Sequence, residues 1–346
     1  MNIVVGIDGS PASKSALRFA LDDARALDAE VIAVGSWQPA VYPVGGLYGG
    51  VTAGDSPDLD PVIHERVQAV IDEVRTAQDP VPTIQTGCGS AALLLMDVAA
   101  DAEELVVGTR GRGALASAVL GSVSHQLANH APCPLIVVPG PSAADDDTVD
   151  TATVDTATVD TATVDTATVD TATAAADTER ADVETAEQDA PSASSPATLP
   201  NVIVVGVDGS PNAAAALNWA LARAARTSAV VRVVHSWEDS YAPWVPTIPT
   251  DQFPPRVDLM EHEARASLHR IIAEADVPAG VTVHPLLHEG PSARVLRDVA
   301  ASAGLLVVGS RGIGGFVGLL LGSVARTCLN HVEVPVAVIP PPADHQ

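Results

Sequence analysis

The sequence predicts an α/β protein built from two doubly wound parallel-sheet domains, and three observations lead to this fold class. Apolar residues make up 47% of the 346 residues and aromatic residues only 3%, so the cores must consist of Val, Leu, Ile and Ala, as in parallel sheets covered by helices. Short apolar runs alternate with amphipathic segments, the order typical of a wound α/β sheet. The whole pattern then occurs a second time along the chain.

The repeat is seen directly in two pairs of segments. The segment NIVVGIDGSP at 2–11 recurs as VIVVGVDGSP at 202–211, and LVVGTRG at 105–111 recurs as LVVGSRG at 306–312. The offset is 200 residues in the first pair and 201 in the second, so one net insertion separates the copies. We therefore predict a duplicated domain, with copies at 1–140 and 201–341.

Residues 141–200 form a linker between the copies that we predict to be disordered. They contain four consecutive Thr-Ala-Thr-Val-Asp repeats at 151–170, and fourteen acidic side chains against the single arginine Arg180. A five-residue period fits neither a helix nor a strand, and the segment has few large apolar groups to offset the entropy of the chain. A solvated tether and a Thr-rich site for phosphorylation or partner docking both stay open.

Each copy is expected to contain five strands with a helix in most connections. In the first copy the strands are predicted near 2–7, 30–36, 81–87, 104–109 and 134–138. The first helix is predicted to begin after Gly9, with Ser10 as N-cap and Pro11 at its first position. In such sheets, ligands bind beyond the carboxyl ends of the strands, where the strand order reverses.

Glycine-rich loops follow the fourth strand in both copies. The loop of the first copy runs from Gly108-Thr-Arg-Gly111 through nine residues to Gly121-Ser122. The second copy repeats this spacing from Gly309-Ser-Arg-Gly312 to Gly322-Ser323. Glycines let the backbone approach a ligand, and a helix that begins after them presents N–H groups with partial positive charge. Two loops of identical spacing, each after a buried strand, indicate a phosphate-binding site in each copy.

This spacing, together with the first strand ending in Asp-Gly-Ser, resembles the nucleotide signature of the universal stress protein family. The resemblance extends over nearly all of 1–140 and 201–341, and includes the closing segments APCPLIVVP and VEVPVAVIP. It implies two five-stranded, Rossmann-like domains of the kind also called adenine nucleotide alpha hydrolase-like. Because many members bind ATP, it also implies ATP as the ligand, with or without Mg²⁺.

The resemblance further implies which residues surround the nucleotide. Asp8 and Asp208 would approach the ribose, the phosphates or a Mg²⁺ ion, although capping of the following helix is an alternative role for both. Val34 and Val234 would hold the adenine through their backbones. The phosphates would be surrounded by Gly108, Arg110, Gly111, Gly121, Ser122 and Val123 in the first site, and by Gly309, Arg311, Gly312, Gly322, Ser323 and Val324 in the second.

These patterns favour an ATP-binding regulator of the stress response over a dedicated enzyme. The sequence has no GxxxxGK[ST] motif, and GxGxxG does not occur after the first strand. No nucleophile, base and orienting group can be assembled from the repeated positions, so no catalytic residue is assigned. A slow ATPase or nucleotidyl transferase on the same fold, and a scaffold that has lost nucleotide binding, are the alternatives.

Charge and cysteine content limit the partners. A net charge of −25 with one lysine excludes nucleic acid and anionic membranes as ligands. Three widely spaced cysteines suggest neither disulfides nor a zinc site, and a start without a basic leader predicts a cytoplasmic protein. The apolar edge strands near 134–138 and 335–339 need to be covered, and the family resemblance implies that such strands pair between domains, so we predict that the two domains dock on each other as a pseudo-dimer. A homodimer of chains on top of this pairing stays open.

Overall fold

The structure, a computed structural model, describes six stretches of the chain. They are residues 1–38, 59–109, 120–141, 201–238, 256–312 and 321–341. The predicted disordered linker lies outside the described residues, except for its first residue, Pro141.

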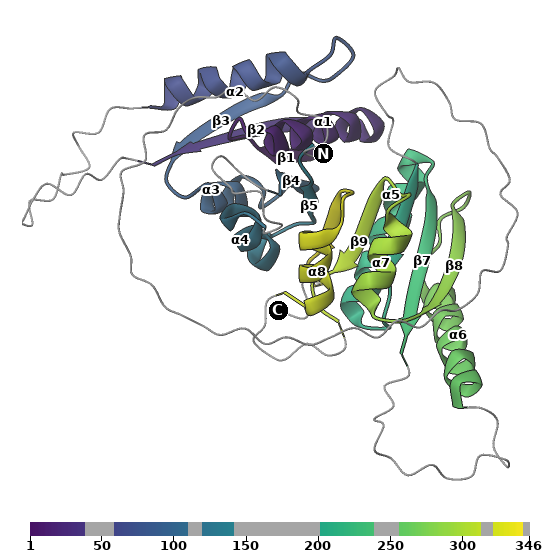
Figure 1. The fold of residues 1–346 in the computed structure, drawn as a ribbon. Coiled ribbons are helices and arrows are strands. Elements are labelled where there is room, and N and C mark those ends of the chain that lie inside the picture. Colours follow the sequence, from purple (N-terminus) through teal and green to yellow (C-terminus); the bar gives the residue numbers. More distant parts are fainter. Residues whose placement is uncertain (39–58, 110–119, 142–200, 239–255, 313–320, 342–346) are drawn as a thin grey trace, which may run out of the picture. The chain divides into compact units, whose positions relative to one another are not determined.

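Both copies contain the predicted alternation of strands and helices (Figure 1). The elements of the first copy are β1 (Asn2–Gly6), α1 (Pro11–Leu27), β2 (Glu30–Trp37), α2 (Asp60–Val74), β3 (Thr83–Cys88), α3 (Ala91–Val98), β4 (Glu104–Gly108), α4 (Ser122–His130) and β5 (Leu135–Val138). Those of the second copy are β6 (Val202–Gly206), α5 (Pro211–Thr227), β7 (Val230–Trp237), α6 (Arg256–Glu274), β8 (Thr282–Glu289), α7 (Ser292–Ala300), β9 (Leu305–Gly309), α8 (Ser323–His331) and β10 (Val336–Ile339). The predicted strands of the first copy are confirmed to within two residues at each end.

Each copy forms a parallel sheet in which the strand order reverses at the first strand. The order is β3-β2-β1-β4-β5 in the first copy, and β8-β7-β6-β9-β10 when the second copy is written the same way. Within each copy all strand pairs are parallel. The two edge strands β5 and β10 pair antiparallel, with Val336 opposite Val137, so that the sheet has ten strands.

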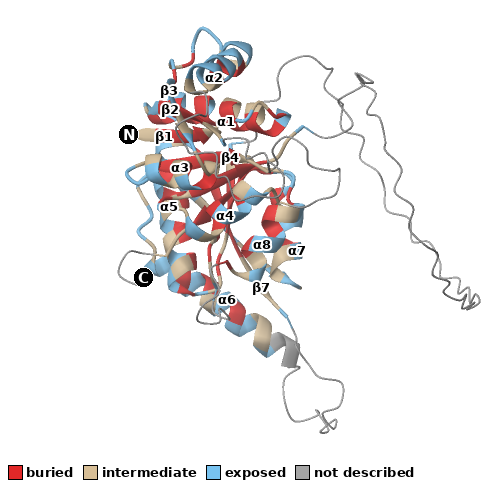
Figure 2. Ribbon diagram, turned by 90° about the vertical axis from the view of Figure 1, so that its left-hand side faces the viewer, coloured by how far each residue is buried: buried red, intermediate tan, exposed pale blue. Residues whose placement is uncertain are grey.

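Helices cover both faces of the sheet and produce two apolar layers. Ile3 and Val5 of β1 belong to the layer under α1 and α2, whereas Val4 between them belongs to the layer under α3 and α4. All three residues are fully buried, and Figure 2 shows the strands of the sheet largely in red, the colour of buried residues. A strand with both faces covered needs the continuous apolar run seen in the sequence. Among the helices that the structure describes, none combines the length and the hydrophobicity that a membrane crossing needs.

The turn between β1 and α1 follows the predicted capping pattern. The Ser10 hydroxyl accepts a hydrogen bond from the backbone N–H of Ser13 at 3.2 Å, and Pro11 opens the helix. Gly9 has a φ of +80°, a value that favours glycine. The same arrangement occurs at the start of α5, where Ser210 caps the helix. The turn after the first strand therefore has one fixed geometry in both copies.

An ion pair ties α1 to the segment that follows α2. Two guanidinium nitrogens of Arg18 donate to the two carboxylate oxygens of Asp79, each at 2.8 Å. The backbone N–H and the hydroxyl of Thr76 also donate to this buried carboxylate. The hydrogen bonds from Arg18, followed by those from Thr76, hold the pKa of Asp79 well below its usual range despite its burial.

Asp79→Asn should lower the free energy of unfolding by about 2–4 kcal/mol, because Arg18 loses the carboxylate that it binds. Glu73→Gln, which removes the exposed partner of Lys14, should cost less than about 1 kcal/mol and serves as control. Since the lowered pKa of Asp79 means that its stabilisation is lost as pH falls below about 4, the difference between wild type and Asp79→Asn should shrink between about pH 5 and pH 2. Urea unfolding at each pH measures this, and a difference that stays constant would contradict the assignment.

Candidate functional site

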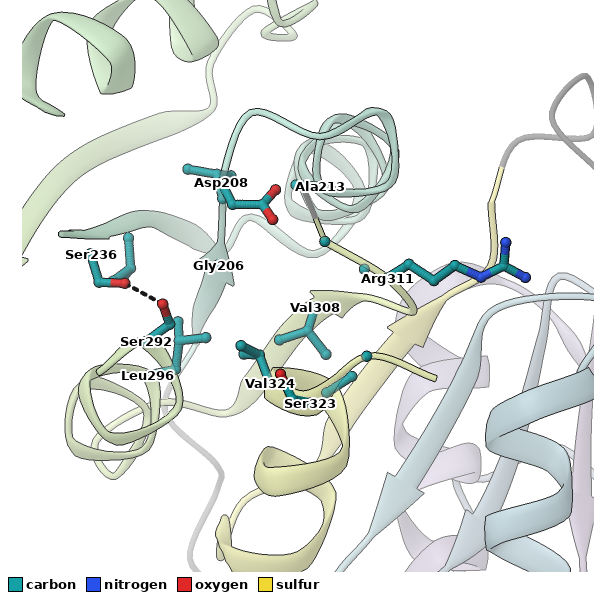
Figure 3. A pocket seen from close by; sticks show the side chains of 16 residues that line it. Gly206, Asp208, Ala213, Ser236, Ser292, Leu296, Val308, Arg311, Ser323 and Val324 are labelled. Carbon is teal, nitrogen blue, oxygen red and sulfur yellow. Dashed lines mark hydrogen bonds between the residues drawn. The ribbon is translucent and has the colours of Figure 1, made fainter. Parts of the chain in front are cut away.

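A cavity of about 420 Å³ lies beyond the carboxyl ends of β6 and β9 (Figure 3). These strands are neighbours in the sheet, and the chain winds outward from them in opposite directions. This is the position at which wound α/β sheets bind their ligands. The residues that line the cavity are Gly206, Val207, Asp208, Ala213, Val234, Ser236, Ser292, Leu296, Val308, Gly309, Arg311, Gly312, Gly322, Ser323, Val324 and Ala325.

All eight residues that the sequence predicts for the second site line this one cavity. They are Asp208, Val234, Gly309, Arg311, Gly312, Gly322, Ser323 and Val324. They come from four places in the chain: the ends of β6, β7 and β9, and the start of α8. Folding thus brings the predicted set together, while their contact with a nucleotide stays a prediction.

The N-terminus of α8 supplies the polar end of the cavity. Ser323, Val324 and Ala325 form the first turn of the helix and all three line the cavity. The backbone N–H groups of a first turn have no partner within their own helix, and the helix dipole adds partial positive charge there. The N-cap residue Gly322 has no side chain to occupy these donors, and its own N–H donates to the Ser310 carbonyl at 2.7 Å. The arrangement suits an anionic group such as a phosphate.

Asp208 both shapes the first turn and borders the cavity. Its Oδ1 accepts a hydrogen bond from the backbone N–H of Ser210 at 2.9 Å. A Cβ atom on Gly312 would overlap with its Oδ2, so glycine at 312 leaves room for the carboxylate. The N-cap of α5 is Ser210, so this hydrogen bond of Asp208 stabilises the turn before the helix, and Asp208 itself lies at the cavity wall. Asp8 makes the equivalent bond to Ser10 at 2.9 Å.

Gly108 and Gly309 have a packing role that sequence analysis missed. A Cβ on Gly309 would lie 2.9 Å from the backbone carbonyl carbon and oxygen of Asn212 in α5. A Cβ on Gly108 would lie 2.7 Å from the carbonyl carbon of Ala12 in α1. Both strand ends therefore touch the first turn of a helix, and this contact requires glycine with or without a ligand.

Arg311 borders the cavity, but its charged group is directed elsewhere. In Figure 3 its side chain extends away from Asp208 and Ser323. Its Nε atom is buried and has no hydrogen-bond partner among the residues that the structure describes. A contact between the guanidinium group and a phosphate would thus require another side-chain rotamer, and the predicted role of Arg311 stays a prediction.

One side of the cavity contains two serines that sequence analysis did not select. Ser236 at the end of β7 donates a hydrogen bond to the Ser292 hydroxyl at the start of α7, at 2.7 Å (Figure 3). Val234, the predicted adenine contact, lines the cavity, while its carbonyl oxygen accepts from the Val207 N–H at 2.9 Å. A serine just after a predicted strand, two residues beyond Val234, is the signal that could have identified Ser236. The first copy has Ser36 at the matching position, but Ala91 instead of Ser292.

The described part of the first site has the same framework. Asp8 follows β1, Val34 lies in β2, Gly108 ends β4, and Ser122 and Val123 begin α4 after its N-cap, Gly121. The Gly121 N–H donates to the Thr109 carbonyl at 2.8 Å, as Gly322 does to Ser310 in the second copy. The predicted residues Arg110 and Gly111 lie outside the described residues.

Metal binding by a cluster of side chains and nucleophilic chemistry at the buried cysteines find no support in the described residues. Within them no group of three or more His, Cys, Asp and Glu side chains is placed to hold a metal ion. Burial raises the pKa of the Cys133 and Cys328 thiols to about 12, so neither is a thiolate at neutral pH.

Comparison with known proteins gives consistent matches along the chain. The model of the universal stress protein family matches residues 1–139 and 201–340. The universal stress protein Rv1996 of Mycobacterium tuberculosis is 26% identical, over 99% of this chain and 96% of that protein. A universal stress protein of Mycolicibacterium smegmatis is 28% identical, over 98% and 97%. The crystal structure of a universal stress protein from Archaeoglobus fulgidus shares the fold with a TM-score of 0.54 at 16% identity, covering 99% of this chain and 98% of that one.

The two loop glycines of the second site should respond differently to substitution. Gly309→Ala should lower the free energy of unfolding by about 1–3 kcal/mol, because the added methyl group meets the backbone of Asn212. Gly312→Ala should cost less, about 1 kcal/mol or below, because the Asp208 side chain can rotate away. Urea unfolding of both variants measures this, and equal losses would contradict the packing role given to Gly309.

Proposed function

The chain belongs to the universal stress protein family, and we propose that it binds ATP in one site per copy and acts as a nucleotide-dependent cytoplasmic regulator of the stress response. One observation supports this proposal most strongly. The eight residues predicted for the second site, brought from four places in the sequence, line a single cavity at the reversal point of the sheet. A ligand site is the simplest reason for this convergence.

The dimensions and walls of the cavity are compatible with an adenine nucleotide. Its volume of about 420 Å³ falls within the usual range of small-molecule sites. The first-turn N–H groups of α8 and the glycine loop offer donors for the phosphates. Val234, Leu296 and Val308 provide apolar surface for the base. The Ser236 and Ser292 hydroxyls lie on the same wall, where they can bind polar atoms of the base or ribose.

The carboxylate of Asp208 determines how the nucleotide would lie. A triphosphate placed directly against this carboxylate would be repelled. We propose that Asp208 accepts hydrogen bonds from ribose hydroxyls or faces a Mg²⁺ ion that accompanies the phosphates. The Mg²⁺ dependence of ATP affinity separates the two arrangements.

We propose binding without dedicated turnover. Among the described residues that line the cavity there are three serines and one carboxylate, and no histidine, lysine or second carboxylate that could act as a base for a serine. The nucleotide would then act by stabilising one form of the protein, rather than as a substrate. The slow ATPase remains the competing function.

Calorimetric titration of the full chain with ATP and Mg²⁺ should give two sites with affinities in about the micromolar range. Gly312→Val should abolish binding at the second site and reduce the stoichiometry to one, because its side chain displaces Asp208 and fills the phosphate end of the cavity. Glu261→Gln, in an exposed ion pair on α6, should bind as wild type does. A titration of the wild type without binding heat at several temperatures would refute the proposed function.

Product analysis after prolonged incubation with ATP separates the regulator from the enzyme. We expect ATP to be recovered intact at times when the sites are saturated. Steady release of ADP or AMP that is lost in the Asp8→Ala, Asp208→Ala double variant would establish the competing ATPase or nucleotidyl transferase instead.

A further inference from the structure

A buried ionic cluster lies where the two copies meet. Arg223 of α5 is 8% exposed, and its Nη1 donates to Glu104 Oε2 of β4 at 2.8 Å. Its Nη2 donates to Asp23 of α1. The guanidinium also lies over two aromatic rings, 5.8 Å from the centre of Phe19 and 5.1 Å from that of Trp219. Both carboxylates of the first copy in this cluster, Asp23 and Glu104, thus bind the same guanidinium group of the second copy.

The cluster has a high desolvation cost because it buries three charged side chains between two surfaces. Glu104 is fully buried, Asp23 is 8% exposed, and one guanidinium serves both carboxylates. Burial raises the pKa of Glu104 well above its usual value, and the nearby Asp23 acts in the same direction, while Arg223 opposes them. Apolar side chains of similar volume often stabilise such a position as well or better. Selection of the partner is therefore a better explanation of this cluster than a gain in stability.

The charges occupy matching positions that have diverged between the copies. Asp23 in α1 and Arg223 in α5 are both the thirteenth residue of the corresponding helix. Glu104 pairs with Ile3 in the sheet of the first copy, and Leu305 pairs with Ile203 at the matching point of the second. An acid in one copy thus corresponds to an arginine or an apolar residue in the other.

A second ion pair at the same junction also joins an arginine of the second copy to an acid of the first copy. Arg226 of α5 lies 3.4 Å from Glu103, and its Nη2 donates to the Leu27 carbonyl at 2.7 Å. The residues that match Arg226 and Glu103 in the other copy are Ala26 and Gly304, which carry no charge. In both pairs the cation comes from the second copy and the acid from the first.

We infer that the charged side chains of α1 and β4 at this junction select the second copy, residues 201–341, as the partner of the first copy and reject another first copy. Two first copies joined in this way would bury two Asp23 and two Glu104 side chains without a cation. Two second copies would bring two Arg223 side chains together, with Leu305 where the carboxylate is needed. Like-charge contacts of this kind discriminate strongly against the wrong pairing. The apolar strands β5 and β10 lack this discrimination, because both are fully buried runs of similar composition.

The inference is tested on the full chain, with a protease site placed within 141–200 and cut after folding. Unlabelled and ¹⁵N-labelled cut proteins are mixed, dissociated in urea, dialysed together and measured by native mass spectrometry. Mixed-isotope complexes of a first with a second copy should form. The amount of complexes with two first copies, and that of complexes with two second copies, should each be less than about a tenth of the amount of first–second complexes. First–first, first–second and second–second complexes of the wild-type protein in proportions near the statistical 1:2:1 would overturn the inference.

A charge reversal then changes the preference in a defined direction. Asp23→Arg places an arginine against Arg223 in the native pairing, but gives two first copies an arginine for each Glu104. Complexes of two first copies should therefore increase by about tenfold or more. Asp23→Arg combined with Arg223→Asp should restore the native pairing. Asp72→Arg, the same charge change on an exposed position of α2, should leave the distribution as in wild type. A distribution that Asp23→Arg does not alter would contradict the role of the cluster.

Discussion

The close contact between the end of the fourth strand and the first turn of the first helix determines the geometry of the proposed site. In the second copy this contact places the backbone of Gly309 against Asn212, and in the first copy that of Gly108 against Ala12. The first helix is in turn fixed by the Asp-Gly-Ser turn, in which Asp208 accepts from Ser210 and Ser210 caps the helix. Gly312, three residues after the strand end, lies beside Asp208. The Asp208 carboxylate and the first turn of α8 thus line the same cavity.

This juxtaposition explains what the cavity can bind. The first turn of α8 attracts an anion, whereas Asp208 repels one unless hydroxyl groups or a cation lie between them. A ligand with a phosphate end, a hydroxyl-bearing middle and an apolar ring satisfies both groups at once. An adenine nucleotide has this order of groups, and the apolar wall with the Ser236 and Ser292 hydroxyls completes the match. The duplicated framework in the first copy extends the argument to a second site.

Much of this arrangement could be predicted from the sequence because it depends on local patterns that occur twice. Strand runs, the Ser10 cap and the glycine spacing are readable without a structure, whereas the eight residues of the second site come from the resemblance to the universal stress protein family that these patterns carry. Features that depend on contacts between distant segments could not be predicted. The packing role of Gly309 depends on how closely α5 approaches, and Ser292 joins Ser236 only when α7 folds over β7. Arg223 resembles an ordinary helix charge until the fold buries it beside Asp23 and Glu104.

The central claim is that the N-terminus of α8 and the glycine loop before it hold the phosphates of ATP. A crystal structure of the full chain grown with ATP and Mg²⁺ tests it most directly. We expect the phosphates within hydrogen-bond distance of the Ser323 and Val324 N–H groups, the base against Val234, and the ribose or the metal ion beside Asp208. An empty cavity at saturating ATP, or a nucleotide bound elsewhere on the protein, would contradict the account.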